Sequence, residues 1–81
     1  MRVNFYGSLG ERIGRSVDVD LPEAGCRISD LRAQLANLFP HAAGELARPS
    51  VRACVMDQIV DEEYFVDSSV AVDFFPPLSG G

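Results

Sequence analysis

One helical pattern lies in the middle of the chain, and alternating apolar segments lie on both sides of it. The apolar positions that repeat at helical spacing are Leu31, Leu35 and Leu38. Ser29 is predicted to cap this helix, with Asp30 placed favourably in its first turn. Pro40 ends the helix near Leu38 or Phe39. We therefore expect one long helix of about 10 residues, which must bury its apolar stripe against a sheet.

Period-two alternation predicts the strands of that sheet. They are expected at Val3–Tyr6, Val17–Leu21, Val51–Val55, Ile59–Val60 and Val70–Phe75. Asp57-Gln58 is expected to turn the chain before the short fourth strand. The glycine-rich segment 7–14 is predicted to be a loop, or one helical turn around residues 11–13, and segment 42–47 can form another short turn.

The predicted order is strand, strand, helix, strand, short strand, strand, which is the layout of an α+β, ubiquitin-like β-grasp fold. One helix across one mixed sheet of about five strands is the simplest two-layer arrangement, with a right-handed crossover through the helix. The 81 residues indicate one domain. We expect it to span residues 1–75, with residues 76–81 as a projecting tail.

Strand alternation also predicts which side chains leave the core. Val3 and Phe5 are expected to face one way and Tyr6 the other. In the last strand Phe74 is expected on the core face, so Phe75 lies on the face away from the helix. Exposed aromatic side chains beside a projecting tail favour a docking surface over ordinary sheet-face aromatics.

The charge is uneven along the chain. The net charge is −5, every basic residue is an arginine, and all of them lie at or before Arg52. Residues 53–81 carry six acidic side chains and no basic one. Nucleic-acid binding is therefore not expected, and the acids serve either solubility or the approach of a basic partner. Because the chain has no lysine, no side-chain amine can attack its own activated terminus.

Conventional catalytic and metal-binding sets are not expected. Cys26 and Cys54 form no C-x-x-C pair, and a single His41 adds no metal-ligand cluster. The start of the sequence has no signal-peptide pattern, and no stretch approaches 18 apolar residues. We expect a cytoplasmic protein with no membrane association and no stably bound cofactor.

The most informative segment is the last one, Phe74-Phe75-Pro76-Pro77-Leu78-Ser79-Gly80-Gly81. Residues 76–81 can extend at most roughly 20 Å beyond the last strand. Pro76 and Pro77 stiffen the base of this tail, and Gly80 and Gly81 lack side chains, so the tip can enter a narrow channel. A terminal glycine carboxylate can be activated by ATP as an acyl-adenylate, from which a sulfur nucleophile displaces AMP and leaves a thiocarboxylate.

This ending resembles the tail of the small subunits of molybdopterin synthase, which typically close with Phe-Phe-Pro-Pro-(Val/Leu)-(Ser/Thr)-Gly-Gly. Segment 10–14, the helix start at 28–35 and the hairpin at 51–60 fall in the order of that family. The tail is the specific part of the resemblance. One departure is Tyr6, where relatives often carry Phe.

The resemblance implies a sulfur carrier. Gly81 would be adenylated by a ubiquitin-E1-like enzyme that uses ATP and would become a thiocarboxylate. Residues 76–80 (Pro76, Pro77, Leu78, Ser79 and Gly80) would insert with it into the large, catalytic subunit of molybdopterin synthase. There the sulfur would pass to cyclic pyranopterin monophosphate and form the molybdopterin dithiolene. Tyr6, Ile59 and Phe75 would contact the large subunit, so this chain would be the non-catalytic donor of a two-subunit sulfurtransferase.

Three alternatives remain open at this stage. The first is a sulfur carrier for another pathway, such as thiamine or cysteine synthesis. The second is a ubiquitin-like modifier that forms isopeptide bonds with lysines of target proteins. The third is a non-covalent binding module, for which Gly81 would be dispensable.

Overall fold

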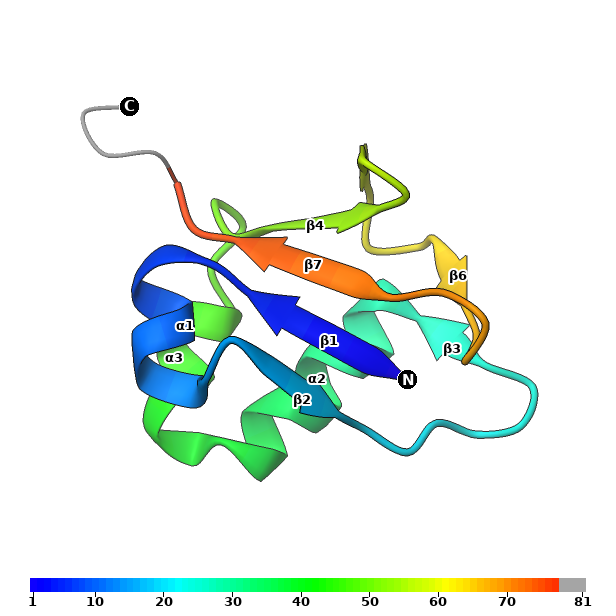
Figure 1. Cartoon of the computed structure of the whole chain (residues 1–81), viewed down its shortest axis with the longest axis horizontal. Helices are drawn as coiled ribbons and strands as arrows, with labels where there is room; N and C mark the ends of the chain where they lie inside the picture. Colours follow the sequence, from blue (N-terminus) through cyan, green and yellow to red (C-terminus); the bar gives the residue numbers. More distant parts are fainter. Residues whose placement is uncertain (78–81) are drawn as a thin grey trace.

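A five-stranded mixed sheet dominates the computed structural model, which describes residues 1–77 (Figure 1). Its strands are β1 Arg2–Phe5, β2 Ser16–Asp18, β4 Arg52–Val55, β5 Gln58–Val60 and β7 Val72–Phe75. Their order across the sheet is β2-β1-β7-β4-β5. The central pair, β1 and β7, is parallel, and every other pair is antiparallel. The first and last strands of the chain therefore lie side by side and end at the same edge.

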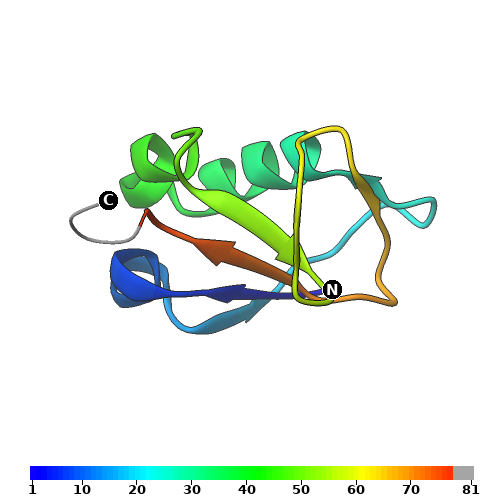
Figure 2. The same ribbon diagram turned by 90° about the horizontal axis from the view of Figure 1, so that it is seen from above.

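The helices cover one face of this sheet and leave the other face open (Figure 2). They are α1 Gly7–Ile13, α2 Ile28–Leu38, the 3₁₀ turn η1 Pro40–Ala42 and α3 Ala43–Leu46. The core between the two layers is apolar and includes Val3, Leu9, Leu31, Leu35, Leu46, Val51, Val72 and Phe74. This is the β-grasp, ubiquitin-like fold that the order of elements predicted.

The predicted faces of the two central strands are confirmed. Val3 and Phe5 are buried, whereas Tyr6 is exposed just after β1. In β7, Val72 and Phe74 are buried and Phe75 points out on the open face. The hydrophobic requirement of a single buried face fixes this register, because a one-residue slip would expose both phenylalanines of the core.

The glycine-rich segment after β1 is a seven-residue helix, so the prediction of a loop or a single turn was too short. Leu9 belongs to this helix and is fully buried in the core, and burial of its side chain favours the helix over a loop. Gly10 lets the helix approach the strand, since a Cβ at that position would lie 2.8 Å from the carbonyl oxygen of Phe5. Gly14 then ends the helix with a φ of 120°.

The start of α2 also differs from the prediction. The helix begins at Ile28, so Arg27 is the cap residue and the predicted cap at Ser29 is wrong. The Asp30 carboxylate instead accepts a hydrogen bond from the Arg27 backbone N–H at 3.2 Å. At the other end of the helix, Leu38 is 54% exposed and therefore lies outside the buried stripe. Ile28, the first residue of the helix, is buried and belongs to the stripe.

Three further details were missed because they depend on pairing across the sequence. β2 is shorter than the predicted strand 17–21, although Val19 still donates to the Met1 carbonyl at 2.9 Å. A second small sheet pairs β3 Cys26–Arg27 with β6 Phe65–Val66. The turn between β4 and β5 is centred on Met56 and Asp57, one residue earlier than predicted, and both have positive φ, as tight hairpin turns require.

Candidate functional site at the base of the tail

The chain leaves the sheet at the end of β7, next to the start of α1 (Figure 1). Pairing with β1 continues to this point, because the Tyr6 N–H donates to the Phe74 carbonyl at 3.1 Å. Gly7, with a φ of 60°, lies directly against Pro76; a Cβ on Gly7 would come within 2.8 Å of the proline Cγ. The base of the tail is therefore held against the end of β1 by backbone pairing and close packing.

Two aromatic side chains lie on the open face at this exit point. The rings of Tyr6 and Phe75 stack with their centroids 4.4 Å apart and their planes 7° apart. Tyr6 is 44% exposed and Phe75 is 38% exposed. A stacked pair loses little further conformational freedom on binding, and aromatic residues are enriched at protein interfaces. We call these two residues the aromatic pair.

Ile59 lies on the same face, at the outer strand β5. Ile59 pairs with Cys54 of β4, and Cys54 pairs with Asp73 of β7. Asp73 is two residues before Phe75, so all four side chains are on the same face of the sheet. Ile59 is 62% exposed, which is high for a β-branched apolar residue. The structure thus brings the three predicted contact residues, Tyr6, Ile59 and Phe75, to one helix-free surface, with a polar row between them in which Asn4 donates to Asp73 at 2.8 Å.

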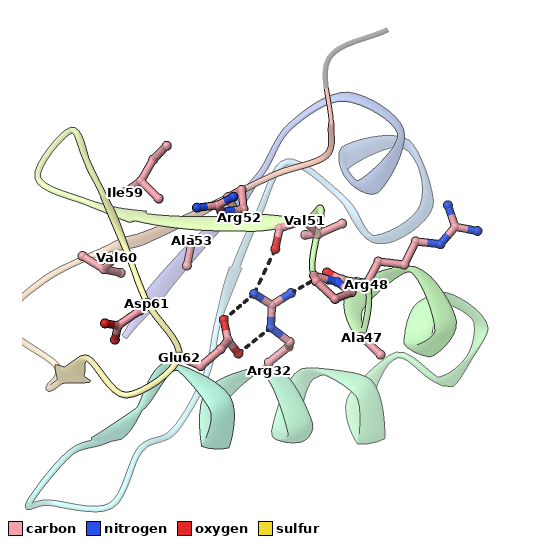
Figure 3. A pocket seen from close by; sticks show the side chains of 11 residues that line it. Arg32, Ala47, Arg48, Val51, Arg52, Ala53, Ile59, Val60, Asp61 and Glu62 are labelled. Carbon is pink, nitrogen blue, oxygen red and sulfur yellow. Dashed lines mark hydrogen bonds and ion pairs between the residues drawn. The ribbon is translucent and has the colours of Figure 1, made fainter. Parts of the chain in front are cut away.

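Beneath the exit point, Arg32 connects α2 with the loops around β4 (Figure 3). Its guanidinium donates to both carboxylate oxygens of Glu62 at 3.0 and 2.8 Å. It also donates to the carbonyls of Leu46 at 2.6 Å and Val51 at 2.9 Å. The Arg32 Cζ lies 5.3 Å from the ring centre of Phe74, which directly precedes Phe75 in β7. This side chain supports the end of β7 from the core side.

Neither cysteine thiol is activated as a nucleophile. Burial raises the pKa of the Cys26 thiol above 9.0, and the nearby Asp30 raises it further. Burial also raises the pKa of Cys54, with smaller contributions from Asp73 and Asp57. Both side chains are therefore protonated at neutral pH, where only a thiolate attacks or binds metal well.

The single histidine is used for structure. The His41 Nε2 lies 2.8 Å from the carbonyl oxygen of Arg12, so this nitrogen carries a proton that it donates. Within residues 1–77 there is no group of three or more His, Cys, Asp or Glu side chains that could hold a metal ion. The described part of the chain also contains no helix that is both long and apolar enough to cross a membrane.

The predicted tail residues fall partly outside the described residues. Pro76 is partly buried and Pro77 is exposed. Leu78, Ser79, Gly80 and Gly81 lie outside residues 1–77, so their predicted roles stay predictions.

Two residues of the exit point were missed by sequence reasoning, namely Gly7 and Arg32. A glycine directly after a strand indicated only a turn, and no local pattern marks an arginine that packs below a distant strand.

Comparison with solved structures shows the same fold in three differently named proteins. The model matches SAMP1 from Haloferax volcanii with a TM-score of 0.85 and 18% identity, over 99% of this chain and 97% of that one. It matches a putative molybdopterin converting factor, subunit 1, from Pyrococcus furiosus with a TM-score of 0.78 and 21% identity, over 95% of each chain. It matches Urm1 from Trypanosoma brucei with a TM-score of 0.70 and 19% identity, over 99% and 93%.

No protein-family model and no curated protein sequence matches this chain. The structural matches cover nearly the full length of each neighbour, so the likeness concerns the whole domain. At these identities it is the fold that the comparison establishes.

Proposed function

We propose that this chain is the sulfur-carrier subunit of molybdopterin synthase. The observation that carries the proposal is the geometry of the exit point. β7 ends at Phe75 beside the start of α1, and the aromatic pair lies at this point on the helix-free face. A tail that must enter a partner needs a contact surface around its base, and this fold supplies one.

The chemistry would take place on the Gly81 carboxylate. One carboxylate oxygen attacks the α-phosphorus of ATP and releases pyrophosphate, which forms an acyl-adenylate. The outer sulfur of a donor persulfide then adds to the acyl carbon and AMP leaves, which gives an acyl disulfide. A second thiol attacks the donor-side sulfur of this disulfide, so the donor leaves as a disulfide and the chain keeps a thiocarboxylate. The thiocarboxylate sulfur next displaces an oxygen substituent from a carbon of cyclic pyranopterin monophosphate, and hydrolysis of the resulting thioester returns the carboxylate and leaves a thiol on the pterin. A second thiocarboxylated chain supplies the other sulfur of the dithiolene.

Two partners follow from this scheme. A ubiquitin-E1-like enzyme would bind the tail and the ATP during activation. The large subunit of molybdopterin synthase would then receive residues 76–81 in its active site, with Tyr6, Ile59 and Phe75 packed against its surface. This chain would contribute the sulfur and the docking surface, and the partners would contribute the catalytic groups, in the cytoplasm.

The test is the intact mass of the chain after incubation with ATP, the adenylating enzyme and a sulfur donor. We expect a gain equal to replacement of one oxygen by sulfur, located at Gly81 by fragmentation. A chain that lacks Gly81 is the control and should gain nothing. Transfer is then measured by adding the large subunit and the pterin substrate, and formation of molybdopterin with loss of the added mass supports the assigned pathway.

Other outcomes point to other functions. Sulfur gain without transfer to the pterin would indicate a carrier for another pathway. A modifier is the second candidate, because one match is described as small archaeal modifier protein 1. Isopeptide bonds between Gly81 and lysines of other proteins, found by digestion and mass spectrometry, would favour it. No mass gain with an adenylating enzyme that is active on another carrier would contradict the sulfur-carrier proposal.

A further inference from the structure

The arginines of the domain divide into two groups. Four of them form ion pairs: Arg2 with Asp18, Arg12 with Glu45, Arg27 with Glu63 and Arg32 with Glu62. The other three, Arg15, Arg48 and Arg52, are exposed, and no carboxylate of residues 1–77 lies within 4.0 Å of their side-chain nitrogens. These three side chains thus present their charge to solvent.

All three lie at the end of the sheet where the tail begins. Arg52 is directly opposite Phe75 in the pairing of β4 with β7. Arg15 is opposite the end of β1, because the Phe5 N–H donates to its carbonyl at 2.9 Å. Arg48 begins the turn that leads into β4, since the Val51 N–H donates to its carbonyl at 3.0 Å. We call these three residues the arginine collar.

The collar lies on both sides of the aromatic pair. Arg15 lines a hollow with Tyr6 and Gly7 on the β2 side. Arg48 and Arg52 line a hollow of about 510 Å³ on the β5 side, together with Ile59 (Figure 3). The hollows also contain one unpaired acid each, Glu11 and Asp61. Asp73 lies on the same face, two residues before Phe75, so three acids accompany the three arginines, but all the arginines of the domain that lack an ion pair are gathered around the base of the tail.

The opposite end of the domain has the opposite sign. Acidic side chains at the end of β2 and just after it, at the start of α2 and in the turns before β5, β6 and β7 lie there; they are Asp18, Asp20, Asp30, Asp57, Glu63 and Asp67. The basic groups beside them are Arg2 and Arg27, each already paired with an acid, and the Met1 ammonium, which donates to the Val19 carbonyl. The whole chain is acidic, yet its three unpaired arginines lie at the end that any tail-binding partner must approach.

From this charge arrangement we propose that the arginine collar docks on an acidic rim around the tail channel of the adenylating enzyme. The proposal rests on the proposed function, since it requires an enzyme that takes up the tail. Complementary charge at a rim mainly accelerates encounter and orients the domain, and the aromatic pair supplies the apolar contact. The acidic far end would simultaneously be repelled by that rim, which favours the orientation with the tail forward.

The experiment compares two variants that have the same total charge. The collar variant carries Arg15→Gln, Arg48→Gln and Arg52→Gln. The control variant carries Arg2→Gln, Arg27→Gln and Ser68→Glu, all at exposed positions of the far end. Each set lowers the net charge by three. The readout is kcat/KM and kcat for ATP-dependent adenylation of the chain, measured as pyrophosphate release at low and high salt.

We expect the collar variant to lose about tenfold in kcat/KM at low salt, with kcat unchanged. The difference from wild type should shrink as salt is raised to about 0.5 M, because exposed charges are screened. The control variant should stay within about twofold of wild type. Circular dichroism and thermal unfolding verify that both variants are folded.

Four results would overturn the proposal. Equal kcat/KM for the collar variant and wild type would remove the role of the collar while leaving the sulfur-carrier function intact. Equal losses in the two variants would assign the effect to total charge. Collar-dependent binding of a labelled single-stranded oligonucleotide at about 0.15 M salt would assign the collar to nucleic acid. If even the wild-type chain is not adenylated, the proposed function fails, and the collar proposal fails with it.

Discussion

Phe74 and Phe75 are adjacent in β7 but have opposite surroundings, because successive side chains of a strand point to opposite faces. Phe74 is fully buried between the sheet and α2, where the guanidinium of Arg32 lies near its ring. Phe75 stacks on Tyr6 at the surface. The first residue therefore contributes to stability, and the second is available for a partner.

This difference leads to a prediction about binding. Phe75→Ala should weaken binding to the large subunit by at least about tenfold, or about 1.4 kcal/mol, since a stacked aromatic at the centre of an interface is a typical hot spot. Titration calorimetry gives the dissociation constant. Phe65→Ala is the control, because Phe65 is an exposed phenylalanine at the far end of the domain, 57% accessible against 38% for Phe75. Similar affinities for the two variants would remove the aromatic pair from the interface.

The two cysteines give a prediction about pH. Because burial raises the pKa of both thiols above 9.0, the native chain keeps protons that the unfolded chain has already lost at alkaline pH. Their contribution to stability is therefore complete below 9.0 and is lost as pH rises through the higher native pKa values.

Urea unfolding from about pH 8 to about pH 10 measures this effect. The free energy of unfolding should fall with pH, and a Cys26→Ala, Cys54→Ala double variant should show a smaller slope. The same variant should still accept sulfur at Gly81, since neither thiol takes part in the proposed chemistry. A slope equal to that of wild type would contradict the assigned cause.

At the scale of an element, the start of α2 shows which polar residue stabilises a helix end. Two candidates follow the cap position, Ser29 and Asp30, and only Asp30 bonds to the Arg27 backbone N–H. A carboxylate in the first helical turn also interacts favourably with the helix dipole.

We expect Asp30→Ala to lower the free energy of unfolding by about 1 kcal/mol, because it removes both effects. Ser29→Ala should change it by less than about 0.5 kcal/mol, since Ser29 is exposed and not the cap. Urea midpoints of the two variants provide the comparison. A larger loss for Ser29→Ala would mean that the helix starts two residues later in solution.

At the scale of the whole molecule, Arg32 holds together segments that are far apart in sequence. Its donors reach the carbonyls that end α3 and precede β4, and the carboxylate that follows β5. Only 12% of its side chain is exposed, so these groups depend on it for hydrogen bonds that water does not replace.

Arg32→Met keeps the aliphatic volume and removes the donors. We expect it to reduce the free energy of unfolding by about 2–4 kcal/mol, because two carbonyls and part of a carboxylate lose their partner. Arg48→Met, at an exposed and unpaired arginine, should cost less than about 0.5 kcal/mol. Equal urea midpoints for the two variants would show that the network adds nothing to stability.

The sequence by itself determined the fold class, the long helix and the faces of the central strands. These features depend on local periodicity: alternation in Val3–Phe5 and Val72–Phe75, and helical spacing of Leu31 and Leu35, are visible within a few residues. It also determined the candidate chemistry, because the Gly80-Gly81 ending and the preceding prolines are read directly.

Only the tertiary structure decided which of these residues meet. The β1–β7 pairing joins residues about as far apart as the domain allows, and it creates the Tyr6–Phe75 stack and the Gly7–Pro76 contact. The arrangement of charge differs most between the sequence and the structure. Residues 53–81 contain no basic side chain, yet the end of β7 lies among Arg15, Arg48 and Arg52 from the first two thirds of the sequence. Electrostatic potential depends on distance in space, so the position of a charge along the chain could not reveal which charged side chains surround the tail.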